Sequence, residues 1–408
     1  MKNTYPCLIL ITIVLIVTGL SACVPLSQTT PTNSTITKLV ETRERGSVIS
    51  VEHLDGLDRS ALQNIATDFP GNISVQNGAS LYRLTYWTVL QGQPVVASGL
   101  FSIPENNSQP KGVFAYFHGT NATRTTAPSQ PDRVDGNEET AIYAGNNYYV
   151  VLPDYLGLGV STIPQPYLIT KPNVDASIDM LVATRQVIAN MNRPWPSTLF
   201  MMGFSQGGQI VAGVHRALEK KPIEGLRPTA SVGIAGPYDL RITSVPKALE
   251  NECLLCVSYL AWASSAYSAY YKKPLKEALT PRYAQTVPNL FGGSKSGREI
   301  ISELPQKVDD LFNPDFLSQI RANQDNWFTK ALDENETYAW IPIAPIRLYF
   351  GTEDKDVTPE ASQYFYDYAK PRGGNISLHS MGPVDHMDSA SATQVHALTW
   401  FNQLSETK

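Results

Sequence analysis

The amino-acid sequence predicts an α/β protein with a mostly parallel sheet, flanking helices and a helical insertion after the sixth strand. Three observations indicate this fold class. Short apolar runs recur along the chain, helical segments separate most of them, and about a hundred residues between Asp239 and Pro345 contain no clear strand. Continuous apolar runs of this length suit strands that are buried on both faces of a parallel sheet. Alternation of strand and helix implies right-handed crossovers between neighbouring strands.

Eight segments are expected to form strands. Two β-rich runs within residues 81–103 flank the turn at residues 91–94 and predict an antiparallel hairpin. The six apolar runs that follow are residues 112–117, 148–152, 198–204, 231–235, 346–350 and 376–378. Helices are expected between most of these runs, because apolar residues recur there at helical spacing. The segments concerned are residues 174–191, 206–220, 359–369 and 389–403.

The long stretch without strands is expected to be a helical insertion, since unstructured loops of that length are uncommon. Its aromatic-rich segment, residues 260–271, is expected either to line a pocket or to pack the core of the insertion. The chain as a whole has 408 residues, of which 42% are hydrophobic and 17% charged, so it can bury a large core. Its formal net charge of −5 and the absence of a Lys/Arg run argue against a nucleic-acid partner.

The N-terminus has the three parts of a secretory signal peptide. Met1-Lys2 supplies a positive charge, an apolar run covers residues 7–20, and small residues precede Cys23. The run is too short for a comfortable membrane span. The sequence LSAC at residues 20–23 resembles the lipobox of bacterial lipoproteins. That resemblance implies cleavage before Cys23 and a lipid on its thiol; a plain signal peptide or a short anchor is the alternative.

These features predict the domain organisation. Residues 1–22 are the signal peptide and residues 23–50 a lipidated tether, rich in Ser, Thr, Pro and Asn over residues 24–46. The body is expected to comprise a first part of the core, the helical insertion and a second part of the core, at residues 51–240, 241–340 and 341–408. A lipid on Cys23 would anchor the protein to the bacterial envelope. The residue after it, Val24, is not the Asp that would resemble an inner-membrane retention signal, so the resemblance implies the outer membrane.

Two further cysteines, Cys253 and Cys256, form a CxxC sequence within the insertion. In an exported protein this spacing predicts a small local disulfide. Free thiols and a redox function are the alternatives. A zinc site would need two more ligands, which the surrounding sequence does not offer.

The stretch MMGFSQGG at residues 201–208 is the strongest chemical signal. Its serine, Ser205, lies between a buried strand and a helix, with Gly203 and Gly207 two residues before and after it. This is the context in which a nucleophile elbow forms, because only small residues allow so tight a turn. The helix that begins at Gln206 directs its positive dipole end toward a developing oxyanion. A glycine-rich structural turn is the alternative interpretation.

A serine nucleophile needs a base and an orienting acid, in the chain order serine, acid, histidine. His386 is the favoured base because it lies in the loop after the last strand, with His379 as the alternative. Asp354, in GTEDKDV after the fifth apolar run, is the favoured acid. Asp356 and then Asp239 are the alternative acids. The other histidines are expected to be structural, and they are His53, His118, His215 and His396.

The oxyanion of such a reaction needs two backbone N–H donors. We expect one from Gln206, directly after the serine, and the other from Thr120 or Gly119 in the FHGT segment. His118 is expected to hold this segment in place. The glycine-containing segment at residues 154–161 lacks a Walker lysine, and we interpret it as a turn that shapes the cleft.

Five segments together resemble the α/β-hydrolase superfamily, over roughly residues 80–240 and 340–405. They are HGT at 118–120, DYLGLGVS at 154–161, GFSQGG at 203–208, GTEDKDV at 351–357 and DH at 385–386. The antiparallel start and the large insertion are similar to secretory lipases and related carboxylesterases. The resemblance implies Ser205 as nucleophile, Asp354 as acid and His386 as base, without a metal or cofactor. The chain contains no HGGG stretch, which argues against the hormone-sensitive-lipase-like branch.

The sequence therefore predicts a serine hydrolase that cleaves carboxylic esters through an acyl-enzyme, with a small-molecule or lipid ester as substrate. The first alternative is a serine peptidase of the same fold. A peptidase would need a carboxylate for a free substrate amine, and the insertion offers four candidates: Glu250, Glu252, Asp309 and Asp310. The second alternative is a non-catalytic, surface-binding lipoprotein.

Overall fold

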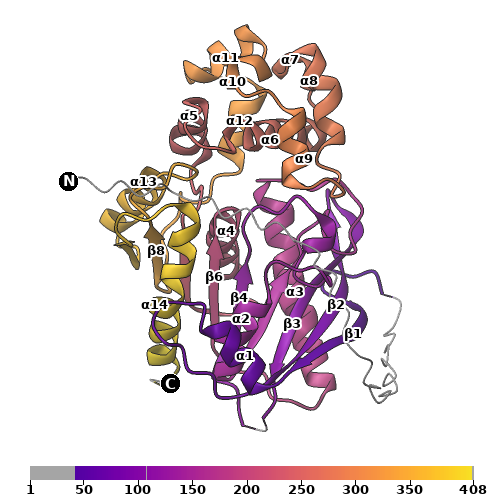
Figure 1. The fold of residues 1–408 in the computed structure, drawn as a ribbon, viewed down its shortest axis with the longest axis vertical. Coiled ribbons are helices and arrows are strands. Elements are labelled where there is room, and N and C mark those ends of the chain that lie inside the picture. Colours follow the sequence, from indigo (N-terminus) through magenta and orange to yellow (C-terminus); the bar gives the residue numbers. More distant parts are fainter. Residues whose placement is uncertain (1–41, 107, 407–408) are drawn as a thin grey trace, which may run out of the picture. The chain divides into compact units, whose positions relative to one another are not determined.

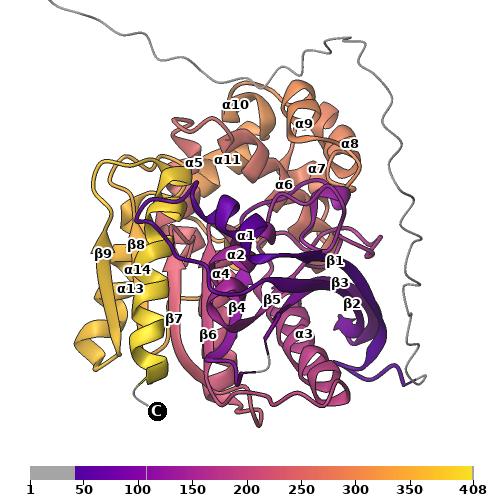
Figure 2. The same cartoon turned by 60° about the horizontal axis from the view of Figure 1, so that its bottom comes forward.

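The computed structural model describes residues 42–106 and 108–406, and its centre is a nine-stranded mixed sheet. The strand order is β1-β2-β3-β5-β4-β6-β7-β8-β9. Figure 2 shows the sheet from β9 at the left to β1 and β2 at the right. The strands are β1 (Val48–Leu57), β2 (Ala79–Leu90), β3 (Gln93–Pro104), β4 (Gly112–Phe117), β5 (Tyr148–Pro153), β6 (Leu199–Phe204), β7 (Pro228–Ile234), β8 (Ile346–Phe350) and β9 (Ile376–Ser380).

The sheet is antiparallel at one side and parallel over the rest. β1 pairs with β2, β2 with β3 and β3 with β5, each in antiparallel register. From β5 through β4 to β9, every neighbouring pair is parallel. The predicted fold class, a mostly parallel sheet with flanking helices and a helical insertion, is confirmed.

Helices cover both faces of the sheet, which explains why its central strands are continuously apolar. In β4, Phe114 and Tyr116 belong to one hydrophobic core, and Val113, Ala115 and Phe117 belong to another. Successive side chains of a strand point to opposite faces, so both sets must be apolar. The helices that contribute to the first core are α1 (Arg59–Ala66), α2 (Asn137–Ile142) and α14 (His386–Glu406). Those of the second are α3 (Thr170–Asn190) and α4 (Gln206–Lys220), while α13 (Pro359–Ala369) packs in a smaller cluster.

The stretch between β7 and β8 consists of helices, as predicted, and they gather beyond one end of the strands (Figure 1). Proline at a first helical position or a capping side chain begins several of them. Examples are Pro281, Pro314 and the N-caps Ser296 and Asn326. The helices are α5 (Val245–Leu249), α6 (Cys256–Tyr271), α7 (Leu275–Ala278), α8 (Pro281–Thr286), α9 (Gly297–Glu303), α10 (Val308–Leu311), α11 (Pro314–Arg321) and α12 (Trp327–Glu334). We call this set the cap.

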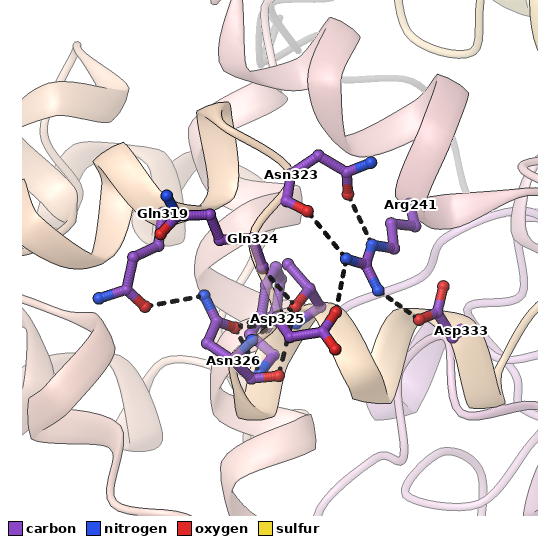
Figure 3. A network of polar contacts seen from close by, with 9 residues as sticks. Arg241, Gln319, Asn323, Gln324, Asp325, Asn326 and Asp333 are labelled. Carbon is purple, nitrogen blue, oxygen red and sulfur yellow. Dashed lines mark hydrogen bonds and ion pairs between the residues drawn. The ribbon is translucent and has the colours of Figure 1, made fainter.

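The cap has its own apolar core, and Arg241 links the chain segment that leads into the cap to the segment near its end. Buried residues from α6 to α12, such as Trp262, Phe312 and Phe328, form a single cluster. Arg241, directly after β7, donates hydrogen bonds to Asn323, and it pairs with Asp325 at 2.8 Å and with Asp333 at 2.5 Å (Figure 3). Because these partners come from the last part of the cap, the guanidinium holds together the two connections to the sheet.

Three boundaries differ from those expected. β1 begins at Val48, and Arg45 already pairs with Asp179 of α3 at 3.1 Å, so the folded body begins before residue 51. β1 was not predicted from the sequence, because its side chains are mostly only partly buried and include charges. With this extra strand, the cap follows the seventh strand in chain order rather than the sixth. Helix α14 begins at His386, three residues before the expected start.

The signal peptide, Cys23 and most of the tether lie outside the described residues. In residues 42–106 and 108–406, no helix combines the length and the hydropathy that crossing a membrane requires.

Candidate active site

Ser205 occupies a strained turn between β6 and α4. Its backbone has φ 55° and ψ −120°, which side-chain-bearing residues rarely adopt. A Cβ atom at Gly203 would overlap the carbonyl oxygen of Gly207, and one at Gly207 would overlap the carbonyl oxygen of Phe117. The two glycines therefore allow the helix to approach the strands closely enough for the turn to form, as the sequence predicts.

Asp354 and His386 are in direct contact. The Nδ1 atom of His386 lies 2.7 Å from Oδ2 of Asp354. The other carboxylate oxygen, Oδ1, accepts hydrogen bonds from the backbone N–H groups of Asp356 and Val357, both at 2.9 Å. Asp354 is 3% exposed and His386 is 6% exposed. The loop after β8 thus fixes the carboxylate, and the carboxylate fixes one nitrogen of the imidazole.

Ser205 and His386 line the same cavity, which has a volume of about 570 Å³. The imidazole lies against the ring of Phe204, with ring centroids 4.7 Å apart. Among the described residues, the structure contains no hydrogen bond between the Ser205 hydroxyl and the His386 ring. Ser205 follows β6 and His386 follows β9; these strands are separated by β7 and β8, but all four are parallel, so the segments after their carboxyl ends lie at the same edge of the sheet.

The expected oxyanion segment borders the same cavity. Gly119 and Thr120, after β4, both line it, and Gln206 is the first residue of α4. The ring of His118 approaches the carbonyl oxygens of Gly119 at 2.7 Å and Asp154 at 3.3 Å. This histidine therefore holds the segment in place, as expected.

The segment at residues 154–161 packs against the oxyanion segment, residues 118–120. Tyr155 stacks on His118 with ring centroids 4.1 Å apart, and its hydroxyl donates to the His118 carbonyl. Asp154 is fully buried and accepts hydrogen bonds from Ser98 and Ser129. Burial raises the pKa of its carboxyl. Asp154 therefore braces the turn. None of residues 154–161 lines the cavity, so the segment contributes to the cleft only through its contacts with the oxyanion segment.

The alternative acids have other partners. Asp356 forms a hydrogen bond with the hydroxyl of Tyr259 on α6 and none with His386. Burial raises the pKa of the Asp356 carboxyl. Asp239 accepts from the backbone N–H groups of Ile242 and Thr243 and so caps a helical turn. Glu353 is exposed.

The alternative histidines also lie elsewhere. His379, in β9, contacts the hydroxyl of Ser377 at 2.8 Å, and burial lowers its pKa. His215, inside α4, pairs with Glu219. His53 is exposed on the edge strand β1, and His396 lies within α14. Of the six histidines, only His386 lines the cavity with Ser205, while His118 contacts Gly119, which also lines it.

The cap forms an aromatic wall of the cavity. Tyr259 and Trp262 of α6 line it together with Phe291. Trp262 stacks between Phe291 and Tyr167, with centroid separations of 4.6 and 4.4 Å. Tyr167 in turn contacts the hydroxyl of Thr120 at 3.1 Å. The segment 260–271 therefore does both things that were expected of it, since Trp262 lines the pocket and others, such as Tyr267, pack the core of the cap.

The disulfide predicted for the CxxC sequence is present. Cys253 and Cys256 are bonded just before and at the start of α6. Leu255, inside this small loop, lines the cavity. The four carboxylates proposed for an amine-binding peptidase, Glu250, Glu252, Asp309 and Asp310, are not among the residues that line it.

A different set of carboxylates, which was not predicted from the sequence, lines the cavity wall: Asp135, Glu138 and Glu139. Glu139 is 2% exposed, and its Oε2 atom accepts from the backbone N–H of Gly136, which caps α2. Burial, followed by the charges of Asp135 and Glu138, raises the pKa of Glu139 to about 8. The acidic run DGNEE at residues 135–139 is the signal in the sequence that corresponds to this wall.

Comparison with solved structures shows the fold. A Legionella pneumophila protein superposes with a TM-score of 0.81 at 24% sequence identity, over 88% of this chain and 98% of that one. The rice cell wall degrading esterase LipA of Xanthomonas oryzae gives 0.77 at 25% identity, over 88% and 97%. Closed Candida antarctica lipase A gives 0.68 at 16% identity, over 92% and 85%. No protein-family model and no curated protein matches the sequence. The chain has the α/β-hydrolase fold.

Proposed function

We propose that this protein is a serine hydrolase that cleaves carboxylic esters. The observation that carries the proposal is the buried contact between His386 and Asp354 at a cavity that Ser205 enters from a strained turn. A serine hydroxyl is a weak nucleophile unless a base takes its proton, and the base is effective when a third group orients it. The solved structures of similar fold include an esterase and a lipase, which supports the same reaction class.

The geometry suggests the following sequence of steps. The Ser205 oxygen attacks the ester carbonyl carbon, while Nε2 of His386 takes the hydroxyl proton and Asp354 stabilises the resulting imidazolium. The carbonyl oxygen becomes an oxyanion, held by the N–H groups of Gln206 and Thr120. His386 passes the proton to the departing alcohol, which leaves an acyl-enzyme on Ser205. Water then gives a proton to His386 and attacks the acyl carbon. His386 returns this proton to the Ser205 oxygen as the acyl–oxygen bond breaks, which releases the acid and restores the serine.

The test is hydrolysis of 4-nitrophenyl esters of graded acyl length by the wild-type protein and by Ser205→Ala. The substitution is expected to lower kcat/KM at least about a thousandfold, with unchanged thermal unfolding. Ser377→Ala is the matched control, because Ser377 also contacts a histidine but does not line the cavity. Undiminished hydrolysis by Ser205→Ala would refute the assignment of Ser205 as the nucleophile, whereas no hydrolysis of any ester by the wild-type protein would favour a non-catalytic binding protein.

The peptidase alternative is decided in the same assay by an ester and an anilide of one acyl group. We expect the ester to react and the anilide to remain intact, because the solved structures of similar fold include an esterase and a lipase. Faster cleavage of the anilide would instead establish a peptidase.

The location of the protein is also a proposal. We propose that Cys23 carries a lipid that anchors the mature chain to the bacterial envelope, at the outer membrane, so that lipid esters lie within reach. Bacteria that express the full chain should incorporate an alkyne fatty acid into it, and Cys23→Ser should abolish this label. A label that persists in Cys23→Ser would disprove lipidation at that residue.

A further inference from the structure

One wall of the cavity carries three carboxyl groups that have no lysine or arginine partner among the described residues. Asp135, Glu138 and Glu139 come from α2 and the loop before it, whereas the aromatic residues Tyr259 and Trp262 of the same cavity come from the cap. Among residues 42–106 and 108–406, none of the three forms an ion pair with a lysine or arginine. No lysine or arginine lines the cavity either.

Asp135 is half-buried and Glu138 is exposed, so both charges remain accessible to a ligand, although partial burial still disfavours them. Burial raises the pKa of Asp135, with the His118 imidazole acting in the opposite direction. Burial and then the charges of Asp135 and Asp68 raise the pKa of Glu138. Glu139 has a structural task in capping α2, whereas hydrogen bonds of this kind are not seen for Asp135 and Glu138. These two carboxylates are therefore the ones available to a ligand.

An independent feature of the same cavity also indicates a ligand. Asn121 is 8% exposed and lines the cavity next to Thr120. Its Oδ1 accepts from the backbone N–H of Thr123 and from the Thr126 hydroxyl, both at 2.9 Å. Its Nδ2 is buried without a hydrogen-bond partner. A buried donor left unpaired costs stability unless a bound molecule supplies an acceptor, and an ester oxygen near Ser205 would do so.

The surroundings of the carboxylates suit an organic cation. Phe69, Tyr116 and Phe204 line the same cavity, and aromatic faces attract ammonium groups. In the described residues, no group of three or more acidic, histidine or cysteine side chains is arranged to hold a metal ion. A cationic group on the substrate itself would meet both the charge and the aromatic surface.

We propose that the cavity selects esters that carry a cationic ammonium group, which Asp135 and Glu138 neutralise while Asn121 donates to an oxygen near the ester. This inference rests on the proposed ester hydrolysis and names its substrate class.

The test uses pairs of esters that differ only in charge. For the acyl side, the 4-nitrophenyl esters of 6-(trimethylammonio)hexanoic acid and of 7,7-dimethyloctanoic acid have the same shape, with nitrogen in one and carbon in the other. For the alcohol side, the butyrate esters of 2-(trimethylammonio)ethanol and of 3,3-dimethylbutanol form the equivalent pair. The permanent charge does not depend on pH, so the ratio of kcat/KM within a pair reports charge recognition alone.

In one of the two pairs the wild-type protein should prefer the cationic ester by about tenfold or more, equivalent to about 1.4 kcal/mol. The double variant Asp135→Asn, Glu138→Gln should bring that ratio to about one while hydrolysis of the neutral ester persists. The control is Asp309→Asn, which removes an exposed carboxylate of the cap and should leave the ratio unchanged.

The outcomes separate this inference from the proposed function. A preference for the neutral ester in both pairs, or a cationic preference that survives the double variant, would overturn the inference and leave ester hydrolysis intact. Loss of hydrolysis of both members in the double variant, with thermal unfolding unchanged, would also overturn it, because the carboxylates would then serve catalysis generally. No Ser205-dependent hydrolysis of any of the four esters would refute the proposed function itself.

Discussion

Replacement of Asp354 by Asn changes the candidate site at a single oxygen. The amide oxygen can keep both backbone hydrogen bonds from Asp356 and Val357, so the loop after β8 should retain its conformation. The amide nitrogen, however, would take the place of Oδ2 and point a donor at Nδ1 of His386, where the carboxylate now accepts at 2.7 Å. The imidazole would then carry its proton on the wrong nitrogen to act as a base toward Ser205.

The expected size of the effect follows from burial. Asp354 is 3% exposed, so water cannot replace the lost negative charge beside the imidazolium that forms in the transition state. An equivalent change in another serine hydrolase lowers kcat about 10⁴-fold, which corresponds to about 5 kcal/mol of barrier. Stability should change by only about 1–2 kcal/mol, because one charge-assisted hydrogen bond is lost while two backbone hydrogen bonds remain.

The assay is kcat and KM for a 4-nitrophenyl ester, together with thermal unfolding of each variant. Asp356→Asn is the control, since it lies two residues away, interacts with Tyr259 and makes no hydrogen bond to His386. We expect this control to keep activity within about tenfold of the wild type. If Asp356→Asn lost activity about a thousandfold and Asp354→Asn did not, the assignment of the acid would be wrong.

Three further predictions concern stability. Gly207→Ala would drive a Cβ atom into the backbone of Phe117 and should cost about 3 kcal/mol on chemical denaturation, whereas Gly292→Ala, with open space around it, should be neutral. The pKa of Glu139 is raised from 4.5 to about 8, so the folded protein binds one more proton than the unfolded chain between these pH values. The free energy of unfolding should therefore fall by up to about 1.4 kcal/mol per pH unit as the pH rises through this range. Glu139→Gln should remove this pH dependence. Arg241→Met should lower the free energy of unfolding by about 1–2 kcal/mol and increase proteolysis at the cap connections; equal resistance of both proteins to protease would contradict a clamping role.

Much of the fold could be predicted because its central elements obey simple patterns. The buried parallel strands are continuously apolar, and α4 and α13 have the predicted bounds, Gln206–Lys220 and Pro359–Ala369. The turn at Ser205 could be predicted because steric exclusion around Gly203 and Gly207 leaves few alternatives to glycine. Both signals are local, so they can be recognised without the tertiary structure.

The features that were missed depend on tertiary contacts. β1 lies at the sheet edge with much of its surface in water, so its sequence need not be apolar. His386 was placed in a loop, but α14 already begins there, and its ring is fixed by Asp354 from a loop 32 residues earlier in the chain. The choice between Asp354 and Asp356 likewise depends on which carboxylate the loop turns inward. Local sequence could not reveal that Glu139 and its neighbours border the same cavity as Ser205.

Covalent labelling by a fluorophosphonate tests the central claim most directly, because the probe reacts only with a serine that a neighbouring base has activated. Intact mass and peptide mapping should show one adduct per chain, located on Ser205, and a much slower reaction in His386→Ala. An adduct on another residue, or equally fast labelling of Ser205→Ala, would contradict the account.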